Sequence, residues 1–292
     1  MSFITNSFFI FIIDITEEEK AKRDEEIKSH YITEETLEQK LVVLDSPGEP
    51  YNGDCWPGNS VWIDYLNLKA QEYFSQQYLR DEHLQKNPHV HIKNDMNEPS
   101  VFNPILECTM PKNNIHTVSH YESTSSTEIS VSEFEHRDVH SLYGILMAKS
   151  SYEGLTQKKI NMDGEEKDLR AFLLSRSFYI GSQKYGTMWI GDSHAKWDHI
   201  KRYIPMCTTV SMSGFSFCGF DTPAFFEDPT PEFCVRGYQV GCLFPFFRAH
   251  SDRKTPRREP YLFSNPFKDA MINAIVTRYE LMPYYYTTFF HH

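Results

Sequence analysis

Acidic residues follow several apolar runs of this chain, and two of them could act together as catalytic groups. "HVHIKND" ends at Asp95 and "TMWIGD" ends at Asp192. A carboxylate is costly to place beside apolar surface unless a partner pairs with it or it takes part in chemistry. Two carboxyl groups that flank a glycosidic bond can hydrolyse it, because one attacks the anomeric carbon while the other protonates the leaving oxygen. Asp95 and Asp192 are therefore a candidate pair.

Other polar side chains near the ends of apolar runs could complete such a site. Arg176 lies in "LLSRS", where a guanidinium can hold hydroxyl groups or orient a carboxylate. His250 in "FFRAHS" offers a neutral donor, and Asp221 and Arg248 complete a polar ring. The structural alternative for each Asp is an N-cap of the next helix. For Arg248 it is a structural ion pair, which we favour over a role in the site.

Histidine and cysteine spacing bears on metal binding and on disulfides. His89 and His91 form an HxH pair that could ligate a metal ion in a hydrolase barrel. They precede the end of their run, which would place them deep in a barrel or outside it. We therefore predict no metal and no other cofactor. The cysteines show no CxxC pair and no zinc-ligand spacing, and Cys207 and Cys218 could either pair or remain free thiols.

The elements that would position these residues alternate between strands and helices. Near-continuous apolar runs are typical of strands buried on both faces. Six such runs are present: those ending at Asp14, Asp95, Asp192 and Asp221, together with "RAFLLSRS" and "FPFFRAH". Helical patterns lie between them, at residues 16–29, 68–85, 136–154, 198–210 and 231–244. This alternation predicts an α/β fold.

A (β/α)8 TIM-type barrel fits the alternation better than a doubly wound sheet. Barrels place their active-site residues at the carboxyl ends of the strands, where these polar residues lie. No GxGxxG motif follows any strand, as a doubly wound dinucleotide-binding sheet would favour. Only about six strands can be counted, so we expect an incomplete barrel over residues 1–292. Residues 17–26 are predicted to be a charged insertion, and residues 116–135 an exposed loop insertion rich in Ser and Thr.

Composition narrows the class of protein and of partner. The 292 residues are 40% hydrophobic and 15% aromatic, which indicates a globular chain. The formal net charge of −11 argues against nucleic acid or an anionic membrane as the main partner. The opening "MSFITNSFFIFIID" lacks a basic region, and its apolar run is too short to span a bilayer. We therefore predict neither a signal peptide nor a transmembrane helix. The apolar ending "YYYTTFFHH" suggests a piece of a longer protein.

Six long motifs of the chain form a recognisable set: "NDMNEPSVFN", "EHRDVH", "WIGD…WDHI", "FSFCGFD", "PFFRAHSDRKTPRREPYL" and "GDCWPG". Together they resemble glycoside hydrolase family 31, in particular its neutral α-glucosidases and the glucosidase II branch. The match runs from about Phe8 to the end of the chain. It implies a (β/α)8 barrel, normally with flanking β domains that are absent here, and retaining hydrolysis of terminal α-linked glucose from oligosaccharides. A glucosidase II type would trim N-glycans in the endoplasmic reticulum lumen and bind a non-catalytic β subunit.

The resemblance assigns a role to each candidate residue. Asp95 aligns with the nucleophile and Asp192 with the general acid/base. Arg176 and His250 align with residues that hold the sugar next to the cleaved bond, and Asp221 with an acidic residue at the rim. The resemblance also implies a disulfide between two of the cysteines, Cys207 and Cys218.

The chain departs from the family's pattern at several positions. Lys93 replaces a Trp two residues before the nucleophile, and alternate residues of a strand share a face. We therefore expect Lys93 to approach Asp95 and to reduce its nucleophilicity. Substitutions at residues 193–194, 196 and 223–224 are expected to crowd the rim, and the family's first two barrel strands have no counterpart. The alternative function is therefore a catalytically impaired carbohydrate-binding protein or a fragmentary homologue. A metal-dependent hydrolase is a third.

Overall fold

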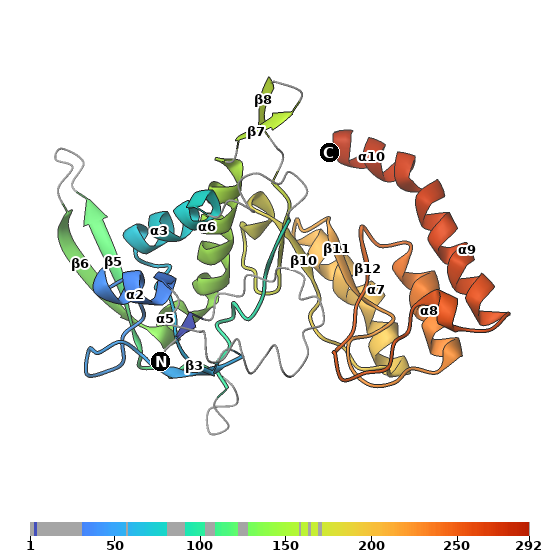
Figure 1. The fold of residues 1–292 in the computed structure, drawn as a ribbon, viewed down its shortest axis with the longest axis horizontal. Coiled ribbons are helices and arrows are strands. Elements are labelled where there is room, and N and C mark those ends of the chain that lie inside the picture. Colours follow the sequence, from blue (N-terminus) through green and yellow to red (C-terminus); the bar gives the residue numbers. More distant parts are fainter. Residues whose placement is uncertain are drawn as a thin grey trace. The chain divides into compact units, whose positions relative to one another are not determined.

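The computed structural model describes residues 3–4, 31–56, 58–80, 91–102, 109–121, 128–157, 159–162, 165–168 and 171–291 (Figure 1). The chain divides into two compact units, Met1–Gly186 and Thr187–His292. Each unit has its own buried hydrophobic cluster or clusters. None of the helices in the described ranges is both long and apolar enough to cross a membrane.

The first unit combines short strands with two long helices. Its strands are β1 Phe3–Ile4, β2 Gly53–Cys55, β3 Gly58–Val61, β4 Ile92–Asn94, β5 Ile115–Tyr121, β6 Glu128–Glu135, β7 Lys159–Met162, β8 Glu165–Asp168 and β9 Leu173–Ser175. Its helices are α2 Tyr31–Glu38, α3 Leu68–Arg80, α5 His136–Val139 and α6 Tyr143–Thr156, with 3₁₀ turns η1 His140–Leu142 and η2 Ser182–Lys184. The strands form a β1-β3-β2 sheet, the β5–β6 and β7–β8 hairpins, and a parallel pairing of β4 with β9.

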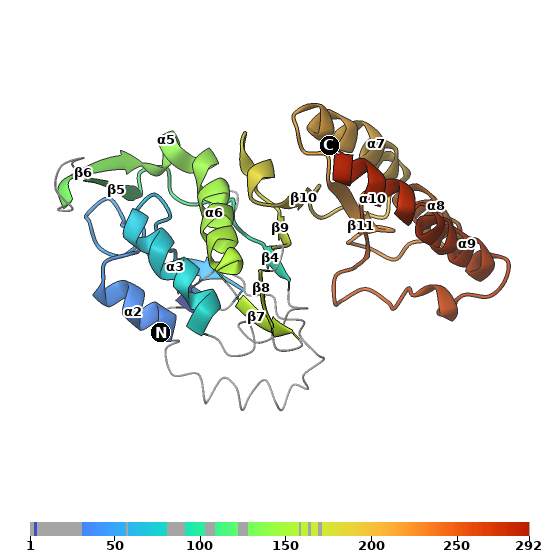
Figure 2. The same ribbon diagram turned by 90° about the horizontal axis from the view of Figure 1, so that it is seen from above.

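Helices α3 and α6 pack side by side in this unit (Figures 1 and 2). Their close approach requires Gly154, because a Cβ there would come 2.4 Å from the Ser75 carbonyl oxygen. Tyr78 of α3 donates to Ser151 Oγ of α6 at 2.9 Å. Ser151 in turn exchanges hydrogen bonds with Asn94, the last residue of β4. The helix pair therefore fixes the carboxyl end of β4, where the first candidate acid follows.

The second unit is a parallel three-strand arrangement with helical connections. Its strands are β10 Thr187–Trp189, β11 Cys218–Thr222 and β12 Phe246–Ala249, with β11 between the other two. Its helices are α7 Trp197–Met212, α8 Pro231–Gly241, α9 Phe267–Glu280 and α10 Met282–His291, with a 3₁₀ turn η3 Pro260–Leu262. One core cluster joins α7 and α8 to β11, and a second joins α8 to α9. This β-α-β-α-β order gives the three strands a common carboxyl edge.

The predicted elements are largely present. Strands were predicted in "HVHIKND", "RAFLLSRS", "TMWIGD", "FSFCGFD" and "FPFFRAH", and these contain β4, β9, β10, β11 and β12. The predicted helix 136–154 is divided into α5, η1 and α6. The strand ending at Asp14, the helix over residues 16–29 and the charged insertion at 17–26 lie outside the described residues.

Residues 116–121 and 128–135, the described part of the predicted Ser- and Thr-rich loop, are not a loop. They lie in strands β5 and β6, in which Val118 pairs with Ser132 and Ile115 with Glu135. The β-branched and aromatic residues of "EISVSEF" alternate with polar ones, and that pattern favours a strand. The loop prediction was therefore wrong, because composition was weighted above alternation. Whether this hairpin is an insertion stays a prediction.

Candidate active site

The first part of the candidate site lies where β4 and β9 end. The two strands are parallel, and Asn94 pairs in register with Ser175. Parallel strands in register bring the residues after their carboxyl ends together. Asp95 and Arg176 are those residues. The pairing explains why acids and bases so far apart in the chain meet at one edge.

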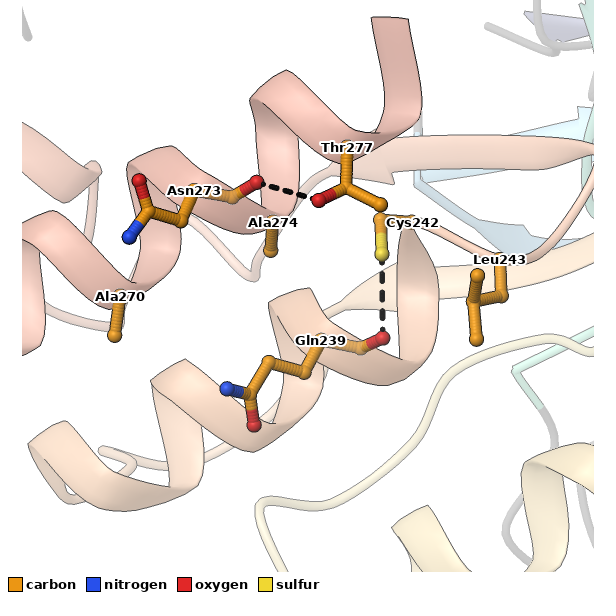
Figure 3. Close-up of a pocket in the computed structure, with 7 residues that line it drawn as sticks. All are labelled: Gln239, Cys242, Leu243, Ala270, Asn273, Ala274 and Thr277. Carbon is orange, nitrogen blue, oxygen red and sulfur yellow. Dashed lines mark hydrogen bonds between the residues drawn. The ribbon is translucent and has the colours of Figure 1, made fainter. Parts of the chain in front are cut away.

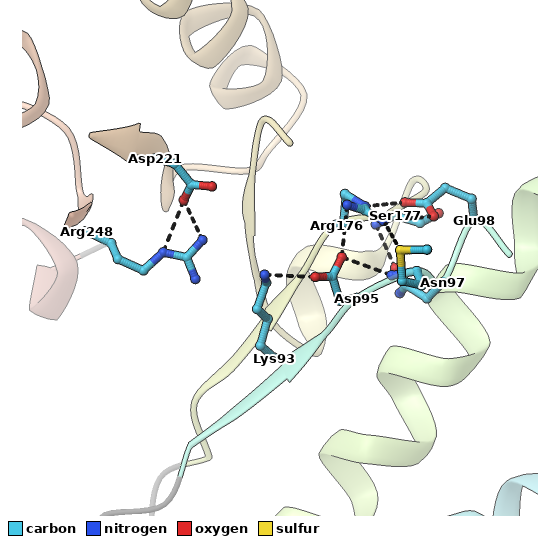
Figure 4. Close-up of polar contacts among 9 residues, drawn as sticks. Lys93, Asp95, Asn97, Glu98, Arg176, Ser177, Asp221 and Arg248 are labelled. Atoms are coloured by element: carbon cyan, nitrogen blue, oxygen red, sulfur yellow. Dashed lines mark hydrogen bonds and ion pairs between the residues drawn. The ribbon is translucent and has the colours of Figure 1, made fainter. Parts of the chain in front are cut away.

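Both carboxylate oxygens of Asp95 face positively charged side chains, and one of them also accepts a hydrogen bond from a backbone amide (Figure 4). Its residue is only 7% exposed. Oδ1 lies 3.1 Å from Nη1 of Arg176 and accepts from the Met96 amide at 3.0 Å. Oδ2 lies 2.9 Å from Nζ of Lys93. The predicted approach of Lys93 to Asp95 is therefore confirmed.

Arg176 is shared between two carboxylates (Figure 4). Its Nε donates to Oε1 of Glu98 at 2.7 Å, while Nη1 faces Asp95. A guanidinium has a planar fork of donors, so one group can bridge two acids. The sequence analysis predicted that Arg176 could orient a carboxylate, and it missed Glu98 as the second partner. The signal that could have found Glu98 is its place in the same short motif as Asp95.

The second unit presents Asp192 just after β10. Asp192 is exposed, whereas the next residue, Ser193, is buried. The Ser193 carbonyl accepts from the amides of Phe225 and Phe226 at 2.9 and 2.8 Å, and Tyr203 donates to Ser193 Oγ at 2.8 Å. The backbone beside Asp192 is thus fixed while the residue itself is exposed, as a residue that exchanges protons with water requires.

Asp221 and Arg248 lie on adjacent strands of the second unit. They are paired in the β11–β12 register, and both Nε and Nη2 of Arg248 contact Oδ1 of Asp221 (Figure 4). Asp221 is fully buried. The structural ion pair that we favoured for Arg248 is present. The same contact explains how the Asp221 carboxylate is tolerated in the interior, and its role at the rim of a sugar site stays a prediction.

His250 follows β12 at the same carboxyl edge. Its amide donates to the Thr222 carbonyl at 3.3 Å, and its ring lies against Phe225 with centroids 5.2 Å apart. The parallel order of β10, β11 and β12 therefore places Asp192, Asp221 and His250 at one edge of this unit. The pairing of Asp95 with Asp192 would join the two units, and it stays a prediction.

Two of the substituted rim positions, His194 and Lys196, form an exposed cluster of charges with Glu227. We call these three residues the rim cluster. Oε1 of Glu227 lies 3.1 Å from Nδ1 of His194 and 3.5 Å from Nζ of Lys196. The hydrogen bond from His194, and then the nearby Lys196 charge, lower the pKa of Glu227. These contacts tie the loop after β10 to the loop after β11.

Residues 223–224 pack tightly beside the rim cluster. Ala224 is fully buried and its carbonyl accepts from Nη1 of Arg258 at 3.2 Å. Pro223 lies so close to α8 that a Cβ at Gly237 would come 2.5 Å from the proline Cβ. Both residues thus pack into the interior of this unit, and the crowding of the rim of a sugar site stays a prediction.

Cys207 and Cys218 are buried, free thiols in this structure. A hydrogen bond with Cys218, and then burial, raise the pKa of the Cys207 thiol. The two sulfur atoms are thus neighbours, as a pairing would require. The disulfide implied by the resemblance stays a prediction.

A cavity of the second unit lies apart from these acids. Its volume is about 380 Å³, and it lies between α8 and α9 (Figure 3). Its lining contains no acidic or basic side chain: Gln239, Cys242, Leu243, Ala270, Asn273, Ala274 and Thr277. Because acid–base hydrolysis needs carboxyl groups, this cavity offers no catalytic pair.

The described residues contain no group of three or more His, Cys, Asp or Glu side chains that could hold a metal ion. The HxH pair gives no support for a metal either. His91 packs its ring against Phe172, with centroids 5.4 Å apart. His89 lies outside the residues that the structure describes.

Comparisons with known proteins agree with this geometry. The model of the glycosyl hydrolases family 31 TIM-barrel domain matches residues 6–288. The chain is 39% identical over 259 residues to the mouse neutral alpha-glucosidase AB, covering 89% of this chain and 25% of that protein. It is 41% identical over 268 residues to a rice protein described as a probable glucan 1,3-alpha-glucosidase, covering 92% and 27%.

A solved structure gives the same result at the level of the fold. The crystal structure of an ER glucosidase II heterodimer, a catalytic subunit with the binding domain of a regulatory subunit, superposes with a TM-score of 0.76. The identity is 38%, and the match covers 91% of this chain and 27% of that one. The chain thus spans about a quarter of the length of these proteins. It belongs to glycoside hydrolase family 31, and its fold is that of the family's (β/α)8 TIM-type barrel, in part.

Proposed function

We propose that the protein containing this chain is a retaining α-glucosidase that removes terminal α-linked glucose from oligosaccharides. The observation that carries the proposal is the buried Asp95 carboxylate, held by Arg176 where β4 and β9 end. A nucleophilic carboxylate has to be fixed in direction, and the Arg176 contact supplies that condition. The family match over residues 6–288 adds the reaction class.

The mechanism has two steps. In the first, Asp95 attacks the anomeric carbon while protonated Asp192 gives its proton to the leaving oxygen, so the glycosidic bond breaks and a glycosyl-enzyme ester forms. In the second, Asp192 takes a proton from water, which displaces Asp95 and releases glucose. Arg176 and His250 would hold the sugar, with Asp221 at the rim.

The two oxygens of Asp95 differ in a way that suggests which one attacks. Oδ1 accepts from the Met96 amide and faces Arg176, whereas Oδ2 faces Lys93. The oxygen with fewer fixed donors keeps more of its nucleophilic character. We therefore assign the attack to Oδ2, from which the Lys93 ammonium has to move away.

Lys93 also favours the alternative function, a catalytically impaired carbohydrate-binding protein. An ammonium 2.9 Å from Oδ2 opposes formation of the ester bond. In that case the protein would bind an oligosaccharide without cleaving it. The two functions predict the same sugar and differ only in turnover.

The names of the relatives suggest the substrate and the partner. One relative is described as a probable glucan 1,3-alpha-glucosidase, and one solved relative is an ER enzyme with a regulatory subunit. We propose by analogy an α-glucosyl cap of an N-glycan as substrate, a non-catalytic β subunit as partner, and the endoplasmic reticulum lumen as compartment.

The test uses the full chain and 4-nitrophenyl α-glucoside. We expect release of 4-nitrophenol, and a fall in rate of roughly 10⁴-fold or more in Asp95→Asn, because the nucleophile is lost. The matched control is Asp138→Asn, which changes an exposed acid of α5. Proton NMR of the first product should show α-glucose, as retention requires. A folded chain that binds the glucoside but releases no 4-nitrophenol would leave the binding function instead.

A further inference from the structure

The segment that carries Asp95 forms several hydrogen bonds with the loop after β9. Two residues of this segment, Asn97 and Glu98, have no contact with the sugar in the mechanism above. We propose that Asn97 and Glu98 are positioning residues that together aim the Arg176 guanidinium at Asp95. This inference rests on the proposed function, in which Arg176 orients the nucleophile. In this proposal, Asn97 and Glu98 fix the position of Arg176 and do not contact the substrate.

Asn97 binds the residues on both sides of Arg176, and its contact with Ser177 is drawn in Figure 4. Its Nδ2 donates to Ser175 Oγ at 2.9 Å, and its Oδ1 accepts from the Ser177 amide at 3.0 Å. Between these two bonds, the amide of Arg176 itself donates to the Asn94 carbonyl at 3.1 Å. One short segment thus binds three successive residues, through the side chain of Ser175 and the backbone amides of Arg176 and Ser177.

Burial makes the Asn97 contacts strict. Asn97 is 1% exposed and Ser175 is 3% exposed, so solvent cannot replace a lost bond. A buried polar group is costly unless its hydrogen bonds are made. Ser175 Oγ also donates to the Ser177 carbonyl at 2.8 Å. A side chain at position 97 that lacks either the donor or the acceptor would therefore release part of this loop.

Glu98 fixes the far end of the Arg176 side chain. An arginine has several rotatable bonds, so a fixed backbone alone does not aim its fork. Oε1 of Glu98 binds Nε at 2.7 Å, whereas Asp95 faces Nη1 at 3.1 Å. Because the guanidinium is planar, holding its Nε leaves one orientation in which Nη1 faces Asp95. Glu98 is the more exposed acid, with 36% of its side chain accessible against 10% for Asp95.

Glu98 also balances the local charge. Lys93 contacts Asp95, and Arg176 contacts both Asp95 and Glu98, so two cations and two carboxylates form one chain of ion pairs. Without the Glu98 charge, both cations would act on Asp95 alone. The positive charge of Arg176 is therefore shared between Asp95, which reacts in the proposed mechanism, and Glu98, which only orients the guanidinium.

The experiment compares Glu98→Gln, Glu98→Ala and Asn97→Asp in the full chain. Gln keeps an acceptor for Nε of Arg176 without the charge, and Asp keeps the acceptor for the Ser177 amide without the donor to Ser175. We expect kcat/KM for 4-nitrophenyl α-glucoside to fall by about tenfold to a hundredfold in Glu98→Ala and Asn97→Asp. Glu98→Gln should recover part of the loss. The controls are Glu153→Gln and Asn52→Ala, both on the surface of the same unit.

A second readout does not depend on activity. Hydrogen exchange followed by ¹⁵N NMR should become at least about tenfold faster at the Arg176 Nε–H in Glu98→Ala. It should rise by a similar factor at the Ser177 amide in Asn97→Ala, a further variant that removes the acceptor of this amide. If the wild-type chain cleaves nothing, the proposed function fails while this exchange still decides the positioning roles. Exchange rates equal to those of the controls would overturn the inference. So would kinetic constants within about twofold of wild type in an active chain.

Discussion

Each unit has a cluster of charged side chains at the ends of its strands. The two clusters differ in how much of each side chain is exposed to solvent. Around Asp95, the side chains of Lys93 and Arg176 are 18% and 19% exposed. In the rim cluster, His194, Lys196 and Glu227 have side chains that are 44%, 59% and 42% exposed. Ion pairs in water contribute little, whereas a buried pair is costly to break. The same residue types should therefore matter far more in the first cluster than in the second.

Histidines show the same contrast. In the first unit the fully buried His116 contacts Asp64 at 2.7 Å, His136 contacts His116 at 2.9 Å, and His140 contacts His136 at 2.8 Å. Asp64 also accepts from the Thr117 amide at 2.6 Å, so the chain of rings anchors the start of the β5–β6 hairpin. His194 of the rim cluster instead pairs with one exposed carboxylate. A buried ring is sensitive to protonation in a way that an exposed ring is not.

The largest effect is therefore expected on acidification of the first unit. Burial, and then the neighbouring His116 and His140, lower the pKa of His136 to about 3. In the unfolded chain the ring titrates near about 6.5. As the pH falls from 6.5 towards 3, His136 is protonated in the unfolded state but stays neutral in the folded state. The contribution of the neutral ring is complete above about pH 6.5 and is lost progressively as the pH falls to about 3, by roughly 3–5 kcal/mol in total.

Urea unfolding of wild type and His136→Asn between pH 7 and pH 4 measures this effect. The free energy of unfolding of wild type should decline with falling pH more steeply, by up to about 1.4 kcal/mol per pH unit. His194→Asn is the control from the rim cluster. A change in slope as large for His194→Asn as for His136→Asn would contradict the importance of burial.

Much of the cluster around Asp95 could be predicted from the sequence, because the geometry of this cluster follows from the order of the strands. The apolar run that ends at Asp95 predicted β4, and "RAFLLSRS" predicted β9 and placed Arg176 where it could orient a carboxylate. The two-residue period of a strand predicted that Lys93 approaches Asp95. These contacts depend only on local pattern and on parallel pairing, which a single sequence can indicate.

Other features depended on register and loop conformation, which the sequence does not display. The grip of Asn97 on Ser175 and Ser177 requires the exact alignment of β4 with β9. The contact of His116 with Asp64 joins residues 52 positions apart, and "EHRDVH" suggested only a family motif. The rim substitutions indicated crowding, but not that they would form an exposed ion cluster. Side-chain pairing across loops is set by tertiary packing, so these contacts could be identified only from the structure.

Lys93→Met tests the buried charge cluster with an effect of intermediate size. Removing the ammonium frees Oδ2 of Asp95 for attack, so we expect kcat for 4-nitrophenyl α-glucoside to rise roughly tenfold, which corresponds to about 1.4 kcal/mol. Lys196→Met, in the exposed rim cluster, is the matched control and should leave kcat within about twofold. A fall in kcat in Lys93→Met would mean that the ammonium assists the reaction, which would reverse our interpretation of this residue.

The smallest effect is expected for Glu227→Gln, and it tests the comparison from the exposed side. The variant removes the carboxylate that His194 and Lys196 share, but water and salt already screen this pair. The urea midpoint at pH 7 should match that of wild type, both in dilute buffer and in about 1 M salt. The Glu227 backbone carbonyl still accepts from Nη2 of Arg258 at 2.7 Å, so the loop keeps its main tether. A clear loss of stability that salt does not reduce would show that the rim cluster acts as a buried network does, and exposure would then no longer explain the difference between the two units.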